Sequence, residues 1–220
     1  MKTAIVIGAT GLIGSNLIKQ LLESDKFKQV KVFTRRSVKI NHPQLEEHIV
    51  DFDQLNSWQY LLTGDVLFSA MGTTMKKAGS KATQYKIDYT YQYDVAAASA
   101  NNGVKTYCLV SSAGANPNSS VFYSRMKGEL DEAVQKLGFK HTFIFRPSIL
   151  AGNRKENRVG EKIGLVLANI VTRVPGLKKY RPIDGNIVAK AMINVAESAG
   201  ERSSIKIYTL GEIFPLADKT

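Results

Sequence analysis

Apolar runs and helical stripes alternate along this chain. Residues 4–7 form a continuous apolar run, which is typical of a strand buried on both faces. Residues 12–23 then repeat Leu and Ile at helical spacing, which predicts a helix with one buried face. Further strands are expected at residues 30–33, 48–50, 66–71, 106–110, 141–146 and 205–210, and further helices at 55–62, 82–101 and 186–197 and just after residue 120. Strands that alternate with helices predict an α/β protein built on a parallel sheet.

Three glycines follow the first strand directly, in the spacing Gly8-x-x-Gly11-x-x-Gly14. Gly8 allows a tight turn, Gly11 lets backbone approach a pyrophosphate, and Gly14 lets the next helix pack close to the strand. The spacing is one residue longer than G-x-G-x-x-G, so these roles rest on analogy, and an ordinary glycine-rich turn is the alternative. The helix that follows offers free N–H groups to phosphates. The turn predicts a dinucleotide site in a doubly wound Rossmann sheet of about seven strands, with contacts from Gly8, Thr10, Gly11, Leu12, Ile13 and Gly14.

Two arginines, Arg35 and Arg36, follow the second strand. An Asp or Glu near this point accepts hydrogen bonds from the ribose 2′-hydroxyl in NAD-specific Rossmann proteins. No carboxylate is present here, and guanidinium groups suit a phosphate dianion. The pair therefore predicts NADP(H) in preference to NAD(H). The alternative is two solvated arginines at a strand end.

Further cofactor contacts are expected where the third, fourth and sixth strands end, because ligands bind beyond the carboxyl ends of parallel strands. Asp51 follows the third strand and is a candidate for contact with the adenine, although a helix-capping role explains it equally well. The other residues expected to contact the cofactor near these strand ends are Phe52, Ala70, Met71, Gly72, Thr73 and Pro147.

Four residues near the fifth strand suggest acid–base chemistry. Ser111 and Ser112 end that strand, and Tyr123 and Lys127 lie four positions apart on the helix that follows. A free tyrosine has a pKa near ~10, and a lysine ammonium one turn away favours the phenolate. Tyr123 could then exchange a proton with a carbonyl or alcohol oxygen that a serine hydroxyl holds, and Lys127 could also bind the nicotinamide ribose.

The sequence resembles the short-chain dehydrogenase/reductase superfamily, in its extended or atypical branch. The resemblance rests on the glycine turn, Ser111-Ser112, Tyr123-x-x-x-Lys127 and Arg146-Pro147-Ser148, and it covers nearly the whole chain. Residues 68–79 and 123–129 resemble the Tat-interacting oxidoreductase subgroup more closely. The resemblance implies a Rossmann fold, NADP(H), a Ser–Tyr–Lys triad and a Pro147 segment that passes over the nicotinamide.

The chain departs from the family pattern at one position and leaves a second assignment open. Members of the superfamily often carry an asparagine on the fourth helix that completes a proton relay, and Asp88 lies in that region here. The pattern Ser-Ser-Ala-Gly favours Ser112 as the active serine, with Ser111 as the alternative. Some members of the subgroup are regulators. The resemblance therefore supports cofactor binding more firmly than turnover.

One segment, residues 147–182, is expected to form a lid or small lobe on the substrate side of a single domain that spans residues 1–220. Its part from 152 to 182 is rich in Lys and Arg and contains an apolar helix at 163–174. A lid for anionic substrates, a basic surface for membranes and a partner-binding patch are the three interpretations. Tyr85, Tyr89 and Tyr93 share one helical stripe, which predicts a half-buried aromatic face, with a partner helix or homodimer as the alternative.

The composition narrows the remaining functional classes. The net charge of +11 is spread over several segments without a basic tail, so polyanionic small ligands are favoured over nucleic acid. The three histidines have no ligand-like spacing, and no metal is expected. No apolar run approaches the ~20 residues of a membrane span, and no signal-peptide pattern is evident. The single cysteine, Cys108, falls in an apolar strand and fits a reducing compartment, so we expect a cytoplasmic protein with an inert buried thiol.

The sequence as a whole predicts an NADP(H)-dependent oxidoreductase that acts on a carbonyl or alcohol through Ser112 or Ser111, Tyr123 and Lys127. Its partner would be a small carbonyl compound, which the basic segment suggests to be anionic. The alternative is an NADPH-binding regulator with little turnover that controls a protein partner.

Overall fold

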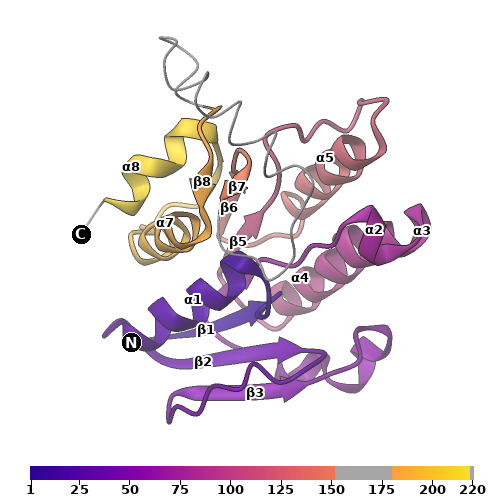
Figure 1. The fold of residues 1–220 in the computed structure, drawn as a ribbon. Coiled ribbons are helices and arrows are strands. Elements are labelled where there is room, and N and C mark those ends of the chain that lie inside the picture. Colours follow the sequence, from indigo (N-terminus) through magenta and orange to yellow (C-terminus); the bar gives the residue numbers. More distant parts are fainter. Residues whose placement is uncertain (152–179, 219–220) are drawn as a thin grey trace.

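A sheet of seven parallel strands forms the centre of the described structure (Figure 1). The computed structural model describes residues 1–151 and 180–218. The strand order is β3-β2-β1-β4-β5-β6-β9. The strands are β1 (Lys2–Ile7), β2 (Phe27–Thr34), β3 (Leu45–Ile49), β4 (Val66–Ser69), β5 (Thr106–Val110), β6 (His141–Arg146) and β9 (Ser204–Thr209). The order changes direction between β1 and β4, which is where doubly wound sheets bind ligands. The predicted Rossmann fold is confirmed.

Helices cover both faces of this sheet (Figure 1). One face carries α1 (Leu12–Glu23), α7 (Gly185–Glu197) and α8 (Phe214–Ala217), and the other carries α4 (Tyr91–Asn101) and α5 (Phe122–Val134). Successive strand residues point to opposite faces, so Ala4 and Val6 pack under α1 while Ile5 and Ile7 pack under α4. The continuous apolar run of β1 therefore fills two cores at once.

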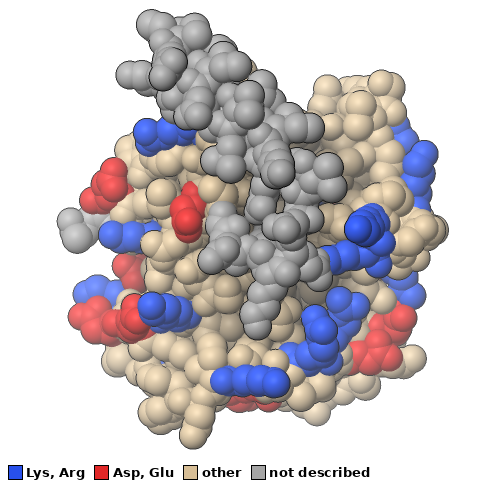
Figure 2. All heavy atoms as spheres, in the orientation of Figure 1, with Lys and Arg blue, Asp and Glu red and all other residues tan. Residues whose placement is uncertain are grey.

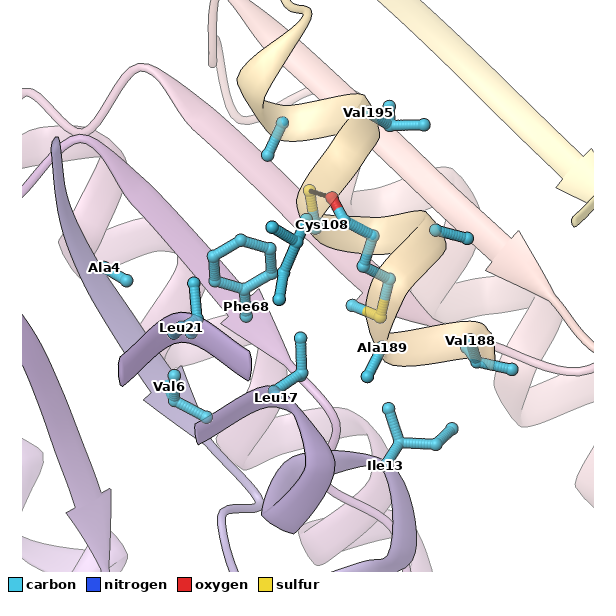
Figure 3. Packing of buried hydrophobic residues seen from close by; sticks show 14 of the residues in the cluster. Ala4, Val6, Ile13, Leu17, Leu21, Phe68, Cys108, Val188, Ala189 and Val195 are labelled. Carbon is cyan, nitrogen blue, oxygen red and sulfur yellow. Dashed lines mark hydrogen bonds between the residues drawn. The ribbon is translucent and has the colours of Figure 1, made fainter. Parts of the chain in front are cut away.

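The core under α1 and α7 encloses the single cysteine (Figure 3). Cys108 lies on β5 among Phe68, Leu17 and Ala189, and its side chain is fully buried. Its thiol lies 3.9 Å from the carbonyl oxygen of Met192 on α7, to which it donates. Burial raises the pKa of this thiol well above its ordinary range. The prediction that this cysteine lies buried in the core is confirmed.

The segment from Asp51 to Leu62 forms two 3₁₀ turns, η1 (Phe52–Ser57) and η2 (Gln59–Leu61), rather than the expected helix at 55–62. The Asp51 side chain accepts a hydrogen bond from Asp53 N at 2.9 Å, and the Trp58 indole donates to the Asp51 carbonyl at 2.9 Å. Gln54 has non-helical φ and ψ angles, which breaks the segment. These side-chain bonds hold a compact turn that helical spacing could not reveal. The capping role weighed for Asp51 is confirmed.

The predicted helix over 82–101 is interrupted by one π-turn. The helix α3 (Lys81–Tyr85) continues into the π-turn η3 (Lys86–Thr90) and then into α4, and the short α2 (Met75–Ala78) precedes it. Tyr89 stacks on Tyr85 at 4.8 Å between ring centroids and on Tyr93 at 5.9 Å. The three rings are half-buried, which confirms the expected aromatic face. A π-turn inserts one residue into a helix and is often found at functional sites.

Buried hydrogen bonds connect this π-turn to the end of β4. The Ser69 hydroxyl donates to Gln92 Oε1 at 2.7 Å, and Gln92 Nε2 donates to the Asp88 carbonyl at 2.7 Å. Asp88 Oδ1 accepts from Thr73 N at 2.6 Å. Asp88 is 1% exposed, and its Oδ2 has no hydrogen-bond partner in the described part of the chain. Burial raises the pKa of Asp88, and the Lys127 ammonium and the Thr73 N–H oppose this rise.

The glycine turn brings α1 into backbone contact with the end of β1. Gly8 has φ of +78°, which favours glycine, and its carbonyl accepts from Gly11 N at 2.9 Å. A Cβ atom on Gly14 would lie 2.1 Å from Gly8 O, and one on Gly8 would lie 2.4 Å from Met71 N. The roles of Gly8 in the turn and of Gly14 in close helix packing follow directly from these contacts.

Gly14→Ala is expected to destabilise the fold by about 1–3 kcal/mol, because backbone atoms of Gly8 and Ala9 occupy the space of the new methyl group. This cost outweighs the roughly 1 kcal/mol that alanine gains over glycine in a helix. Denaturant unfolding measures the change. Gly200→Ala is the control, since no atom lies within 4 Å of a Cβ atom there. A Gly14→Ala protein as stable as wild type would refute the close contact.

Asp88→Asn keeps an oxygen for the Thr73 N–H and removes the buried charge. Because the native pKa of Asp88 lies above the ordinary value of 3.8, the native state binds this proton more tightly than the unfolded state. The wild-type protein therefore loses stability as the pH rises through the native pKa. We expect the stability of Asp88→Asn relative to wild type to increase as the pH rises from about 4 to about 8. Unfolding at several pH values tests this, and a constant difference would contradict it.

Candidate functional site

The candidate site lies where β1 and β4 end. Gly8 packs against the backbone of Ala70 and Met71, and Ala70 N donates to the Ile7 carbonyl at 3.0 Å. Gly11 precedes α1, and no side chain of the described residues caps this helix. The first N–H groups of α1 and the positive end of its dipole therefore remain available to an anion. A cradle that side chains would fill, next to an uncapped helix N-terminus, fits a pyrophosphate.

The predicted contacts of the glycine turn divide into exposed and buried residues. Thr10 and Gly11 are exposed and Leu12 is half-buried, so their atoms can reach a ligand. Ile13 is 5% exposed and belongs to the core under α1. A ligand can therefore meet only the backbone of Ile13, while Gly14 serves the packing of the helix.

The loop after β4 lies directly opposite this turn. Met71 and Thr73 are half-buried and Gly72 is exposed. β4 ends at Ser69, not at Met71 as expected, because Ala70 makes the last backbone hydrogen bond to β1 and Thr73 N turns away to Asp88. Residues 70–73 therefore form a loop held from both sides, at the place where a cofactor would cross the sheet edge.

The two arginines after β2 lie at the same edge of the sheet. Arg35 and Arg36 are exposed, and the Thr34 hydroxyl donates to the Arg36 carbonyl at 2.9 Å. Basic side chains lie over the parts of the surface where β2 ends and where α2 lies (Figure 2). The guanidinium groups of Arg35 and Arg36 are thus in solvent and can contact an anion that extends from the glycine turn.

The residues after β3 lie beside this edge with different exposure. Asp51 is exposed, while Phe52 is 7% exposed and packs edge-on against Trp58 at 5.5 Å. The Phe52 ring is part of the core under α4. Of the two predicted contacts after β3, Asp51 has the exposed side chain.

The serine pair and Pro147 are joined by backbone hydrogen bonds between the ends of β5 and β6. Ser111 N donates to the Phe145 carbonyl at 2.7 Å, and Ala113 N donates to the Pro147 carbonyl at 3.2 Å. Ser111 is 6% exposed, whereas Ser112 is half-buried and reaches the surface. The two serines therefore face different surroundings.

The tyrosine and lysine lie on the first turns of α5. Tyr123 is 39% exposed and Lys127 is 3% exposed, so the phenol is at the surface and the ammonium is inside. A Cβ atom on Gly128 would lie 2.2 Å from Pro117 N, which means that α5 is pressed against the loop that leads into it. This contact holds the helix that carries Lys127 against the loop between β5 and α5.

Two buried carboxylates influence the surroundings of Lys127. The charge of Lys127 lowers the pKa of Asp88 and of Asp131, although burial raises both pKa values more strongly. Asp131 is fully buried one helical turn after Lys127, and Arg146 Nε donates to its Oδ2 at 2.8 Å. The sequence analysis assigned no role to Asp131. Its spacing from Lys127 is the only sequence signal for it.

Most of the expected lid, residues 152–179, lies outside the described residues, and so does the predicted helix at 163–174. Its two ends are joined by a short parallel pair, β7 (Leu150–Ala151) and β8 (Ile183–Asp184). The Ser148 hydroxyl donates to the Arg181 carbonyl at 2.5 Å. The described residues that flank 152–179 on its two sides therefore lie next to each other, close to Pro147.

Two other features concern the described residues as a whole. No cluster of His, Cys, Asp or Glu side chains suited to a metal ion occurs among them. None of the helices within 1–151 and 180–218 has the length and hydropathy needed to cross a membrane.

Comparison with protein families gives one match across most of the chain. Residues 8–174 match the model of the family described as NAD(P)H-binding. The protein named FMP52, mitochondrial, from Candida glabrata is 37% identical over 230 residues, covering 99% of this chain and 96% of the relative. The Aspergillus fumigatus protein named fmp52, mitochondrial, is 36% identical, covering 96% of this chain and 95% of the relative. These names give no activity.

Solved structures share the fold at low sequence identity. The UDP-N-acetylglucosamine 4-epimerase of Methanobrevibacter ruminantium superposes with a TM-score of 0.70 at 19% identity, covering 96% of this chain and 77% of that chain. The enzyme WbmH of Bordetella bronchiseptica, solved with NAD+, gives a TM-score of 0.71 at 15% identity, covering 99% of this chain and 79% of that chain. At this identity the likeness shows the fold alone.

The names of the relatives correct one prediction. A cytoplasmic location was expected from the single cysteine and from the absence of a targeting pattern. The relatives from Candida and Aspergillus are named mitochondrial proteins, so this prediction is wrong. A single buried cysteine reports its own packing and does not distinguish between reducing compartments.

The glycine cradle, the reversal of strand order beside it and the family match agree with one another. The chain belongs to the NAD(P)H-binding family.

Proposed function

We propose that this protein is an NADP(H)-dependent oxidoreductase that reduces a small carbonyl compound or oxidises the matching alcohol. The observation that carries the proposal is the burial of Lys127, which is 3% exposed, one helical turn from the surface phenol of Tyr123. Burying an ammonium is costly, so its place beside an exposed phenol points to a chemical use. The glycine cradle lies at the same edge of the sheet.

The proposed chemistry assigns one task to each side chain. The bound nicotinamide supplies or accepts the hydride. Tyr123 donates its phenolic proton to the carbonyl oxygen during reduction and takes it back during oxidation. Lys127 stabilises the phenolate by its charge. Ser112, the more accessible serine, donates a hydrogen bond to the same oxygen, and Pro147 limits the space above it.

The preference for NADP(H) is proposed from Arg35 and Arg36. Both guanidinium groups are exposed at the carboxyl end of β2, where the ribose of a dinucleotide at the β1–β4 switch point would lie. Paired N–H donors suit a 2′-phosphate. We also propose that residues 147–182 cover the substrate side and that the basic residues there favour an anionic substrate. The names of the fungal relatives further support a mitochondrial site of action.

Arg35→Ala/Arg36→Ala is expected to weaken NADPH binding roughly 10- to 100-fold and to leave NADH binding unchanged, because only NADPH carries the 2′-phosphate. Calorimetric titration with both cofactors measures this. Lys26→Ala/Lys28→Ala is the control, since it removes the same charge from the other end of β2. Equal binding of NADPH and NADH by the wild-type protein would remove the proposed role of the arginines.

Tyr123→Phe is expected to lower carbonyl-dependent NADPH oxidation by roughly 100-fold or more, because the proton donor is lost. NADPH affinity should change little. A panel of aldehydes and ketones, including anionic ones, supplies the substrates. Tyr60→Phe, a change at an exposed tyrosine on η2, is the control. Unchanged turnover in Tyr123→Phe would refute the catalytic assignment, and tight NADPH binding without turnover of any carbonyl would favour the regulator.

A further inference from the structure

Asp131 is a buried carboxylate that the proposed chemistry does not use. It lies on α5 one turn after Lys127, and its side chain is fully buried. Its Oδ2 accepts the hydrogen bond from Arg146 Nε at 2.8 Å. Arg146 is the last residue of β6, directly before Pro147, and its side chain is 21% exposed. One ion pair therefore fastens the tyrosine–lysine helix to the strand end that carries Pro147.

The Asp131 side chain also lies near Ser111. The Ser111 hydroxyl is close enough to lower the pKa of Asp131 against the larger, raising effect of burial, and Arg146 and Lys127 act in the same direction as Ser111. Asp131 Oδ1 and Ser111 Oγ are both buried, and neither has a hydrogen-bond partner among the described residues. The Ser111 N–H meanwhile donates to the Phe145 carbonyl on β6. Ser111 is thus held on the inner side of the loop.

We propose that Asp131 is a positioning residue that joins the ends of β5, β6 and α5 into one unit. Its contacts keep the Ser111 hydroxyl turned inward and leave Ser112 as the hydroxyl that meets a ligand, and they hold Lys127 at a fixed place. The proposal deepens the proposed function and rests on it for the identity of the ligand.

A purely structural role would not require a charge at this position. Apolar residues of similar volume often replace a buried ion pair without loss of stability. Here the pair connects α5 to the end of β6. Lys127 lies one helical turn before Asp131, Pro147 follows Arg146 directly, and Ser111 N donates to the carbonyl of Phe145, the residue before Arg146. A network with this placement fits the support that binding sites need from the residues behind them.

The test compares Asp131→Asn with the matched control Glu132→Gln, which removes the same charge from an exposed neighbour on α5. Two quantities are measured well below the unfolding temperature, the Kd for NADPH and the hydrogen exchange of residues 109–116 and 145–151. We expect Asp131→Asn to weaken NADPH binding about threefold to tenfold, the size of an effect passed through one intervening contact. We also expect faster exchange in both segments. Glu132→Gln should change neither quantity.

A second pair of variants tests the proposal in case Asp131→Asn alone does not fold. Arg146→Gln leaves the buried charge of Asp131 unpaired and is the harsher change, while Asp131→Asn/Arg146→Gln removes both charges. If Asp131 acts through this pair, the double variant should bind NADPH at least as tightly as the single variant with the lower NADPH affinity. Asp131→Glu, which keeps the charge, should restore part of the affinity that Asp131→Asn loses.

The outcomes separate this proposal from the proposed function. A lower unfolding temperature with an unchanged Kd and unchanged exchange would show that Asp131 is only structural and would overturn the inference. If the wild-type protein binds no NADPH, the proposed function fails, and the exchange of the two segments still decides the role of Asp131. Unchanged exchange in Asp131→Asn would then overturn the inference as well.

Discussion

The contact between Gly14 on α1 and the carbonyl of Gly8 determines the geometry of the candidate site. A Cβ atom at Gly14 would lie 2.1 Å from that oxygen, so only glycine lets the helix begin this close to β1. The same closeness brings the uncapped N-terminus of α1 to the loop after β4. The anion-binding character of the site is therefore a property of backbone packing, and side chains add selectivity around it.

Charged side chains inside the fold are concentrated near this edge. Lys127, Asp88 and Asp131 are each at most 3% exposed, and burial raises the pKa of both carboxyl groups. Asp88 reaches the loop after β4 through Thr73 N, and Asp131 reaches β6 through Arg146. Buried groups of this kind are retained where they fix a conformation that apolar packing alone would leave less well specified. They connect the elements that carry the glycine cradle, the serine pair and the tyrosine.

The relatives and the fold support membership of the NAD(P)H-binding family, and they do not identify a reaction. The family match spans the glycine turn, the serine pair and the tyrosine–lysine pair, whereas the named relatives carry no activity. Solved proteins with this fold include two UDP-sugar 4-epimerases, and a shared fold does not by itself establish a shared reaction. The reaction of this protein is therefore decided by the residues around the cradle.

The sequence alone predicted the seven strands of the main sheet, their parallel arrangement and the glycine turn, because apolar periodicity and glycine spacing are local signals. Only the tertiary structure showed that Ile13 and Phe52 point into the cores, that Asp51 holds a 3₁₀ turn and that a π-turn places Asp88 against Thr73. The same holds for Asp131, because Arg146 at the end of β6 and Ser111 after β5 are distant from it in the sequence. Burial and long-range pairing depend on how distant segments pack, and no local pattern contains that information.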